Sequence, residues 1–70
     1  MQTIPRISLK AARVNSGLSQ NEAAKRLGIS RATLQNYESG NTVPDILMSR
    51  KIEEVYGFPA DFIFFGMSTA

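Results

Sequence analysis

The sequence contains no cysteine and no histidine. Their absence excludes disulfides and cysteine nucleophiles, and it removes the most common general base together with nearly every zinc or haem site. No stretch approaches the roughly 20 apolar residues of a membrane span, and the first residues lack the apolar core of a signal peptide. We therefore expect a cytoplasmic protein that is not an enzyme, with no cofactor, no metal, no membrane contact and no evident small-molecule ligand.

The chain is also short, since its 70 residues leave room for one domain. A domain of this size buries only about 60% of the surface that its unfolded chain exposes. Small domains usually compensate with disulfides, metals or oligomerisation. Because the first two are absent here, helix packing and a partner subunit must supply the stability, and we expect a homodimer.

Positive charge is concentrated in the first part of the sequence. The net charge is only +2, but residues 1–40 hold six basic and two acidic side chains, a net charge of +4. Residues 41–70 hold two basic and four acidic side chains, a net charge of −2. If the protein meets the phosphates of a nucleic acid, it should do so with its first half.

Helix start and stop residues divide the chain into five helices and no strands. Serines or an aspartate suited to capping precede the helical segments, and glycines follow them. In the clearest case, Ser19 and Glu22 form a capping box. The pattern predicts a compact, five-helix, all-α domain over residues 8–66, after an arm at 1–7 and before a tail at 67–70. The predicted helices cover about residues 9–16, 20–27, 31–39, 46–56 and 61–65.

Only Gly28, Ile29 and Ser30 separate the second predicted helix from the third. So short a connection forces a sharp turn between two packed helices, and Ile29 is expected to fill the corner. A turn of three or four residues that contains glycine, between two short amphipathic helices, is typical of a helix-turn-helix. We therefore take the helix at 31–39 as the candidate recognition helix.

The outward side of this helix is polar. When Leu34 points inward at 100° per residue, the outer face and its edges carry a guanidinium, a methyl group, a hydroxyl and two carboxamides. These groups read the edges of bases in the major groove of double-stranded DNA. The alternative is that they are ordinary solvated residues, but the preceding tight turn and cap favour base reading. The residues expected to contact bases are Arg31, Ala32, Thr33, Gln35 and Asn36.

Two charged residues fall on apolar helix faces. Arg13 lies four residues after Leu9, and Glu38 lies four residues after Leu34. A buried charge needs a partner, so we predict an ion pair that joins the first helix to the end of the recognition helix. The alternative is that each charge is solvated independently at a helix edge.

Four consecutive apolar residues stand at positions 62–65. A helix in a monomer can bury only part of such a run. The surplus, Phe62 and Phe65 together with Met67, is the predicted dimer contact. The alternative is that the whole segment packs onto the core of its own chain.

With these residues in view, residues 9–66 resemble the lambdoid phage repressor and Cro family, also called the Xre-type helix-turn-helix domain. The resemblance rests on short motifs in the right order and spacing. They are Arg13 with Gly17-Leu18-Ser19-Gln20, Ala24 with Leu27-Gly28-Ile29-Ser30, Leu34 with Tyr37-Glu38-Ser39-Gly40, Pro44, and the segment from Phe62 to Gly66.

The resemblance implies a lambda-repressor-like domain that regulates transcription, as a repressor, by binding a palindromic operator as a dimer. The half-sites would lie about 34 Å apart. It also implies base contacts at Arg31, Ala32, Thr33 and Asn36, and an internal pair of Arg13 and Glu38. The loop after Gly40 has few basic residues, which leaves polar groups to hold the backbone. The residues expected to contact phosphates are Gln20, Ser30, Ser39, Asn41 and Thr42.

Since the sequence ends soon after the domain, it looks most like a Cro-like or modulator protein of a phage genetic switch. A second function from a different class stays open. The same fold could serve as a protein-interaction module, such as an antitoxin subunit or an anti-repressor partner.

Overall fold

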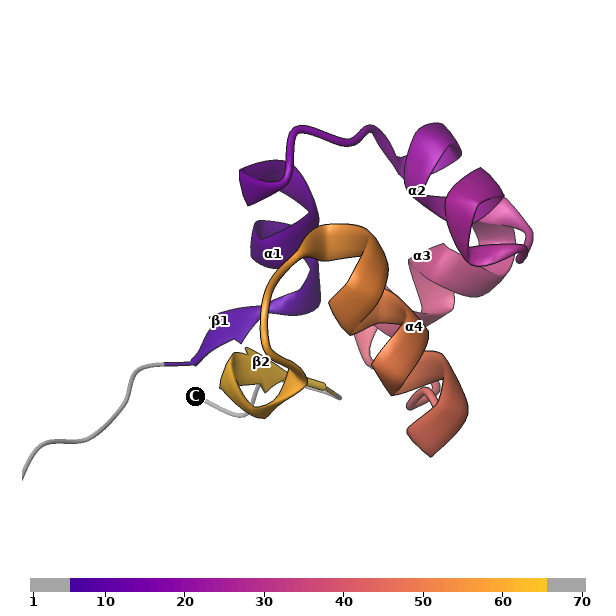
Figure 1. The fold of residues 1–70 in the computed structure, drawn as a ribbon. Coiled ribbons are helices and arrows are strands. Elements are labelled where there is room, and N and C mark those ends of the chain that lie inside the picture. The colour runs from indigo at the N-terminus through magenta and orange to yellow at the C-terminus, as the bar shows by residue number, and fades with distance from the viewer. Residues whose placement is uncertain (1–5, 66–70) are drawn as a thin grey trace, which may run out of the picture.

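The computed structural model describes residues 6–65, and Figure 1 labels its elements. This part of the chain is mostly helical, as predicted. The arm up to residue 5 and the predicted tail at 67–70 lie outside the described residues. No helix within 6–65 has the length and apolar character needed to cross a bilayer. The elements are β1 (Ile7–Ser8), α1 (Leu9–Asn15), α2 (Gln20–Leu27), α3 (Arg31–Ser39), α4 (Ile46–Tyr56), the 3-10 helix η1 (Ala60–Phe62) and β2 (Ile63–Phe64).

Each α-helix begins at a side chain that accepts a hydrogen bond from a backbone N–H three residues further on. These capping residues are Ser8, Ser19, Ser30 and Asp45. At α2 the cap is reciprocal, because the Glu22 carboxylate also accepts from the Ser19 backbone N–H at 3.0 Å. Gly28 and Gly40 end α2 and α3 with φ angles of 73° and 83°, a left-handed conformation that favours glycine.

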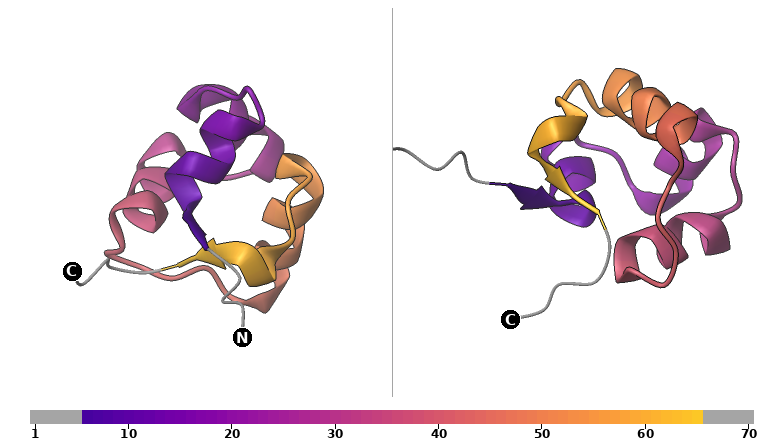
Figure 2. Two further views of the ribbon diagram at one scale, coloured as in Figure 1. Left: turned by 90° about the vertical axis from the view of Figure 1, so that its left-hand side faces the viewer. Right: turned by 90° about the horizontal axis from the view of Figure 1, so that it is seen from below.

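The core lies where α2, α3 and α4 meet. Its largest fully buried side chains are Leu27, Leu34 and Ile52, one from each of these helices. Ala23 and Ala24 are buried on α2, and their small side chains let the neighbouring helices approach closely. Figure 2 shows α1, α2, α3 and α4 arranged around this centre, with α1 closing one side.

The expectation of a fifth α-helix over residues 61–65 and of no strands is wrong for the end of the domain. After Pro59 the chain makes only the single turn η1, which lacks a side-chain cap. It then extends as β2 and pairs in parallel with β1, so that Ile7 lies opposite Ile63. Ile7, predicted to belong to the arm, is therefore part of the folded domain.

The extended backbone suits the residues of this segment. Ile63 is β-branched, which favours a strand, and its side chain is buried in the core. The pairing also ties the beginning of the described chain to its end, and Figure 1 shows both strands beside α1. The predicted helical turns are therefore absent from this segment, and an extended strand that pairs with β1 and buries Ile63 takes their place.

Candidate nucleic-acid interface

The turn between α2 and α3 is held by backbone and side-chain contacts. The Ile29 N–H donates to the Ala24 carbonyl at 3.0 Å, and the half-buried Ile29 side chain packs against the core. Ser30 then caps α3 by accepting from the Thr33 N–H at 3.0 Å. The sharp angle between the two helices is thus fixed by residues within and next to the turn.

The exposed side of α3 is the side opposite Leu34. Leu34 is completely buried, and Tyr37 packs partly against the core. Thr33 is half-buried, and its hydroxyl lies 2.9 Å from that of Ser30. The exposed residues of the helix are Arg31, Ala32, Gln35, Asn36 and Ser39, while Ser30 is exposed just before it. The structure therefore leaves open to a ligand the polar face on which base reading is expected.

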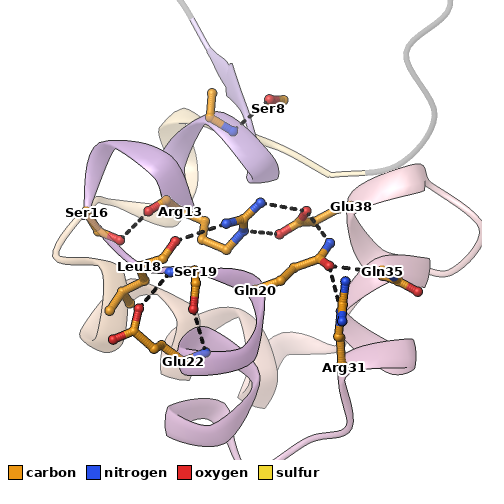
Figure 3. Close-up of polar contacts among 11 residues, drawn as sticks. Ser8, Arg13, Ser16, Leu18, Ser19, Gln20, Glu22, Arg31, Gln35 and Glu38 are labelled. Carbon is orange, nitrogen blue, oxygen red and sulfur yellow. Dashed lines mark hydrogen bonds and ion pairs between the residues drawn. The ribbon is translucent and has the colours of Figure 1, made fainter.

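Arg13 and Glu38 lie together between α1 and the end of α3 (Figure 3). Arg13 Nε donates to Glu38 Oε2 at 2.6 Å, and Nη2 lies 3.4 Å from Oε1. The remaining amino group, Nη1, donates to the Leu18 carbonyl at 2.9 Å. The two side chains are only 9% and 6% exposed, so water does not compete strongly for these bonds.

Gln20 connects this ion pair to the outer face of α3, as Figure 3 shows. Its Nε2 donates to Glu38 Oε1 at 3.1 Å. Its Oε1 accepts from Arg31 Nε at 3.2 Å and lies 3.4 Å from Gln35 Nε2. No local sequence pattern predicts these contacts, because the partners are between 11 and 18 positions apart and belong to different helices.

A second polar group lies at the other end of α3. The Asn36 carbonyl accepts from the backbone N–H groups of Asn41 and Thr42 at 3.0 and 3.3 Å, and from the Ser39 hydroxyl at 3.3 Å. The Asn41 side-chain amide donates to Asn36 Oδ1, also at 3.3 Å. Asn41, expected at a phosphate, therefore lies directly beside Asn36, expected at a base.

The geometry of α2, its tight turn and α3 agrees with a sequence comparison. The family model described as Helix-turn-helix matches residues 9–63. The chain belongs to the helix-turn-helix family. The match runs from the start of α1 into β2, and it confirms the resemblance to Xre-type domains that the motifs indicated.

Three relatives of the helix-turn-helix domain come from Bacillus subtilis. The uncharacterized HTH-type transcriptional regulator YqaF is 40% identical over 71% of this chain and 66% of its own length. The SPbeta prophage-derived uncharacterized HTH-type transcriptional regulator YonR is 36% identical over 83% of this chain and 54% of its own. The HTH-type transcriptional regulator ImmR is 36% identical over 79% of this chain and 43% of its own. The chain thus spans between 43% and 66% of these relatives. No solved structure matches it.

Apolar side chains outside the helix-turn-helix differ in exposure. Phe62 and Phe65, expected at a dimer contact, are half-buried. Phe62 meets the ring of Phe58 edge to face at a centroid distance of 6.3 Å, and Phe65 packs against the core. Met67 lies outside the described residues.

Larger exposures occur just before and at the beginning of α4, outside the predicted sites. Val43, Ile46 and Leu47 are 63%, 69% and 75% exposed. The helical spacing indicates this exposure, because Ile46 and Leu47 lie outside the inward stripe that contains Ile52 and Tyr56. They form an exposed apolar segment that follows the helix-turn-helix in the sequence.

Within residues 6–65, two titratable groups have shifted pKa values. Burial raises the pKa of Tyr56 to about 12; the Glu38 carboxylate also raises it, and Arg13 opposes the shift. The Tyr56 hydroxyl is buried and finds no hydrogen-bond partner among residues 6–65. The pKa of Glu22 is lowered, chiefly because its carboxylate accepts hydrogen bonds from the backbone and hydroxyl of Ser19.

Proposed function

We propose that this protein is a DNA-binding transcriptional regulator that places α3 in the major groove. The observation that carries the proposal is the exposed face of α3, which directly follows the tight turn and presents Arg31, Gln35 and Asn36. An arginine pairs with guanine, and the two carboxamides pair with adenine. Ala32 and Thr33 add methyl groups that suit contact with thymine. The names of YqaF, YonR and ImmR as HTH-type transcriptional regulators support the same class of function.

Polar groups at both ends of α3 are suited to contact phosphates and so to fix the orientation of the helix. Ser30 precedes the first turn, while Ser39, Asn41 and Thr42 follow the base-reading residues. Gln20 lies at the start of α2, and its amide keeps one N–H for a phosphate after the other has bonded to Glu38. Because these contacts carry no sequence information, they should contribute affinity for any DNA.

The regulator is proposed to act as a homodimer on a palindromic operator. A single helix of 9 residues contacts few base pairs, whereas two copies related by a two-fold axis read two half-sites about 34 Å apart. The half-buried Phe62 and Phe65 are the proposed contact between the copies. Bound to an operator, such a dimer would act as a repressor, and the prophage-derived YonR supports a role in a phage genetic switch.

The exposed Val43, Ile46 and Leu47 favour a second candidate function. The centre of a protein interface is typically apolar and contains few charged residues. A module that holds another protein, such as an antitoxin or an anti-repressor partner, would bury this surface. A partner that also covered Arg31 and Asn36 would compete with DNA.

Selection of bound sites from random double-stranded DNA, combined with a mass measurement of the free protein, tests the proposal. We expect a palindromic consensus and an affinity that falls steeply as salt rises, because binding releases counterions from the phosphates. A matched selection with Asn36→Ala should lose one position of the consensus. Absence of salt-dependent binding to any sequence would refute DNA binding, and a stable complex with a second protein that covers Arg31 would favour the interaction module.

A further inference from the structure

The carboxylate of Glu38 determines which way the Gln20 amide faces. A carboxylate has only acceptors, so the Gln20 atom that lies 3.1 Å from Glu38 Oε1 must be the amino group Nε2. The carbonyl Oε1 then faces Arg31 Nε, 3.2 Å away. The reversed amide would place oxygen against oxygen at Glu38 and N–H against N–H at Arg31. Only one of the two orientations is therefore compatible with both neighbours.

Glu38 is itself held in place. Arg13 donates to both carboxylate oxygens, at 2.6 and 3.4 Å, and it is anchored by its bond to the Leu18 carbonyl. A continuous series of hydrogen bonds thus runs from the backbone at Leu18, through the ion pair and Gln20, to Arg31 on the exposed face (Figure 3). Its first members are buried and its last member is exposed.

The bond to Gln20 occupies Nε of the Arg31 guanidinium. The two terminal amino groups lie on the other edge of this planar group, and that edge matches the O6 and N7 acceptors of guanine. A free arginine side chain samples many rotamers, and fixing it upon binding costs conformational entropy. A guanidinium already directed by Gln20 avoids part of that cost, but only for a base that accepts two bonds from its outer edge.

We propose that Glu38, acting through Gln20, is a positioning residue that directs the terminal amino groups of Arg31 toward a guanine. The inference rests on the proposed function, in which α3 reads bases. It assigns to the buried ion pair a role in sequence preference as well as in folding, and it gives Gln20 a role beyond contact with a phosphate.

The first test uses the free protein and needs no DNA. Nuclear magnetic resonance measures how fast the Nε–H of each arginine exchanges with water. In the wild type, Arg31 should exchange more slowly than the exposed Arg26. Gln20→Met, which keeps the length of the side chain but removes both polar groups, should raise the Arg31 rate to that of Arg26. Glu38→Gln replaces the carboxylate by a group that both donates and accepts, so the Gln20 amide can flip. This variant should raise the Arg31 exchange rate to a value between that of the wild type and that of Arg26.

The matched control is Gln35→Met, which removes the other neighbour of Gln20 Oε1 and should leave the Arg31 rate unchanged. Glu38→Gln weakens the ion pair, so circular dichroism of this variant is recorded to check that its helices are intact. If the variant is unfolded, the result for Gln20→Met alone decides the test. An Arg31 rate that is already that of Arg26 in the wild type, or that Gln20→Met does not change, would overturn the inference.

The second test measures base preference on the selected operator. Arg31→Ala identifies the base pair that Arg31 reads. At this position Gln20→Met should reduce discrimination about tenfold, within the range that one bidentate contact supplies, and should leave the other positions unchanged. In the Arg31→Ala background, Gln20→Met should reduce discrimination no further. A loss of affinity that is equal on all sequences, with discrimination at the Arg31 position unchanged, would overturn the positioning role, because it is what loss of a phosphate contact alone produces. A further loss of discrimination in the Arg31→Ala background would also overturn it. If the wild type shows no sequence preference, the proposed function fails, and the guanine contact fails with it. The exchange rates still show, in that case, whether Arg31 Nε donates a hydrogen bond to Gln20.

Discussion

Arg13 is a buried charge that satisfies several acceptors at once. Its guanidinium bonds to Glu38 and to the Leu18 carbonyl, and the residue is only 8% exposed. Removing it leaves the Glu38 carboxylate buried without its cation. Arg13→Ala should therefore lower the free energy of unfolding by about 3 to 5 kcal/mol, measured by urea denaturation. Arg26→Ala on the exposed side of α2 is the control, and an Arg13→Ala midpoint equal to that of the control would contradict a structural ion pair.

Asn36 tests base reading at the level of one side chain. Asn36→Ala should weaken binding to the selected operator by about 1 to 3 kcal/mol and relax the preference at one base pair. Asn41→Ala is a useful companion, because it removes the amide that donates to Asn36 Oδ1 and leaves the Asn36 side chain in place. It should give a smaller loss at the same base pair. Fluorescence anisotropy on single-base variants measures both, and an equal loss by Asn36→Ala on every sequence would show that it reads no base.

Tyr56 predicts a loss of stability at alkaline pH. In the unfolded chain its phenol ionises near the ordinary pKa of 10.0, whereas in the folded protein burial raises the pKa to about 12. Between these values the folded state binds more protons, so the stabilisation present below pH 10 is lost as the pH rises toward 12. The loss should amount to about 2 kcal/mol. The difference in unfolding free energy between wild type and Tyr56→Phe isolates it from lysine ionisation, and a difference constant with pH would contradict the shift.

At the level of elements, the helices were predictable because their signals are local. Ser19, Ser30 and Asp45 act as caps within three residues of the backbone groups that they bond. The end of the domain was not predictable in this way, because Ile63 pairs with Ile7 at the opposite end of the described chain. The hydrogen bonds of Gln20 to Glu38 and Arg31 are non-local too. The polar face of α3 was therefore predictable, whereas the hydrogen bonds that join this face to the buried ion pair were not.

The capping box of α2 can be tested alone. Ser19→Ala removes the hydroxyl that accepts from the Glu22 N–H at 3.1 Å, and it should lower the free energy of unfolding by about 1 kcal/mol. Ser19→Gly should cost only a few tenths of a kcal/mol, because glycine is tolerated at a cap. Thermal unfolding compares the two variants. Equal stability of Ser19→Ala and wild type would mean that the box contributes nothing to the start of α2.

At the level of the whole molecule, the question is which apolar surface a second copy would cover. Phe62 and Phe65 retain some exposure, while Ile46 and Leu47 are more exposed and follow α3 more closely in the sequence. The two surfaces predict different relative positions of the recognition helices. They can be distinguished by substituting one residue of each surface, Phe62 and Leu47, because neither belongs to the fully buried core.

If the protein forms the proposed homodimer, Phe62→Ser should convert it to a monomer, whereas Leu47→Ser should leave it a dimer. In a two-fold interface every substitution occurs twice, so a loss of about 1 kcal/mol per subunit weakens the dimer about 30-fold. Analytical ultracentrifugation over a range of concentrations measures the mass, which for one chain is 7.7 kDa. Circular dichroism shows whether Phe62→Ser, which also loses its contact with Phe58, is still folded. Dissociation by Leu47→Ser alone would place the interface at the start of α4 and contradict the contact through Phe62.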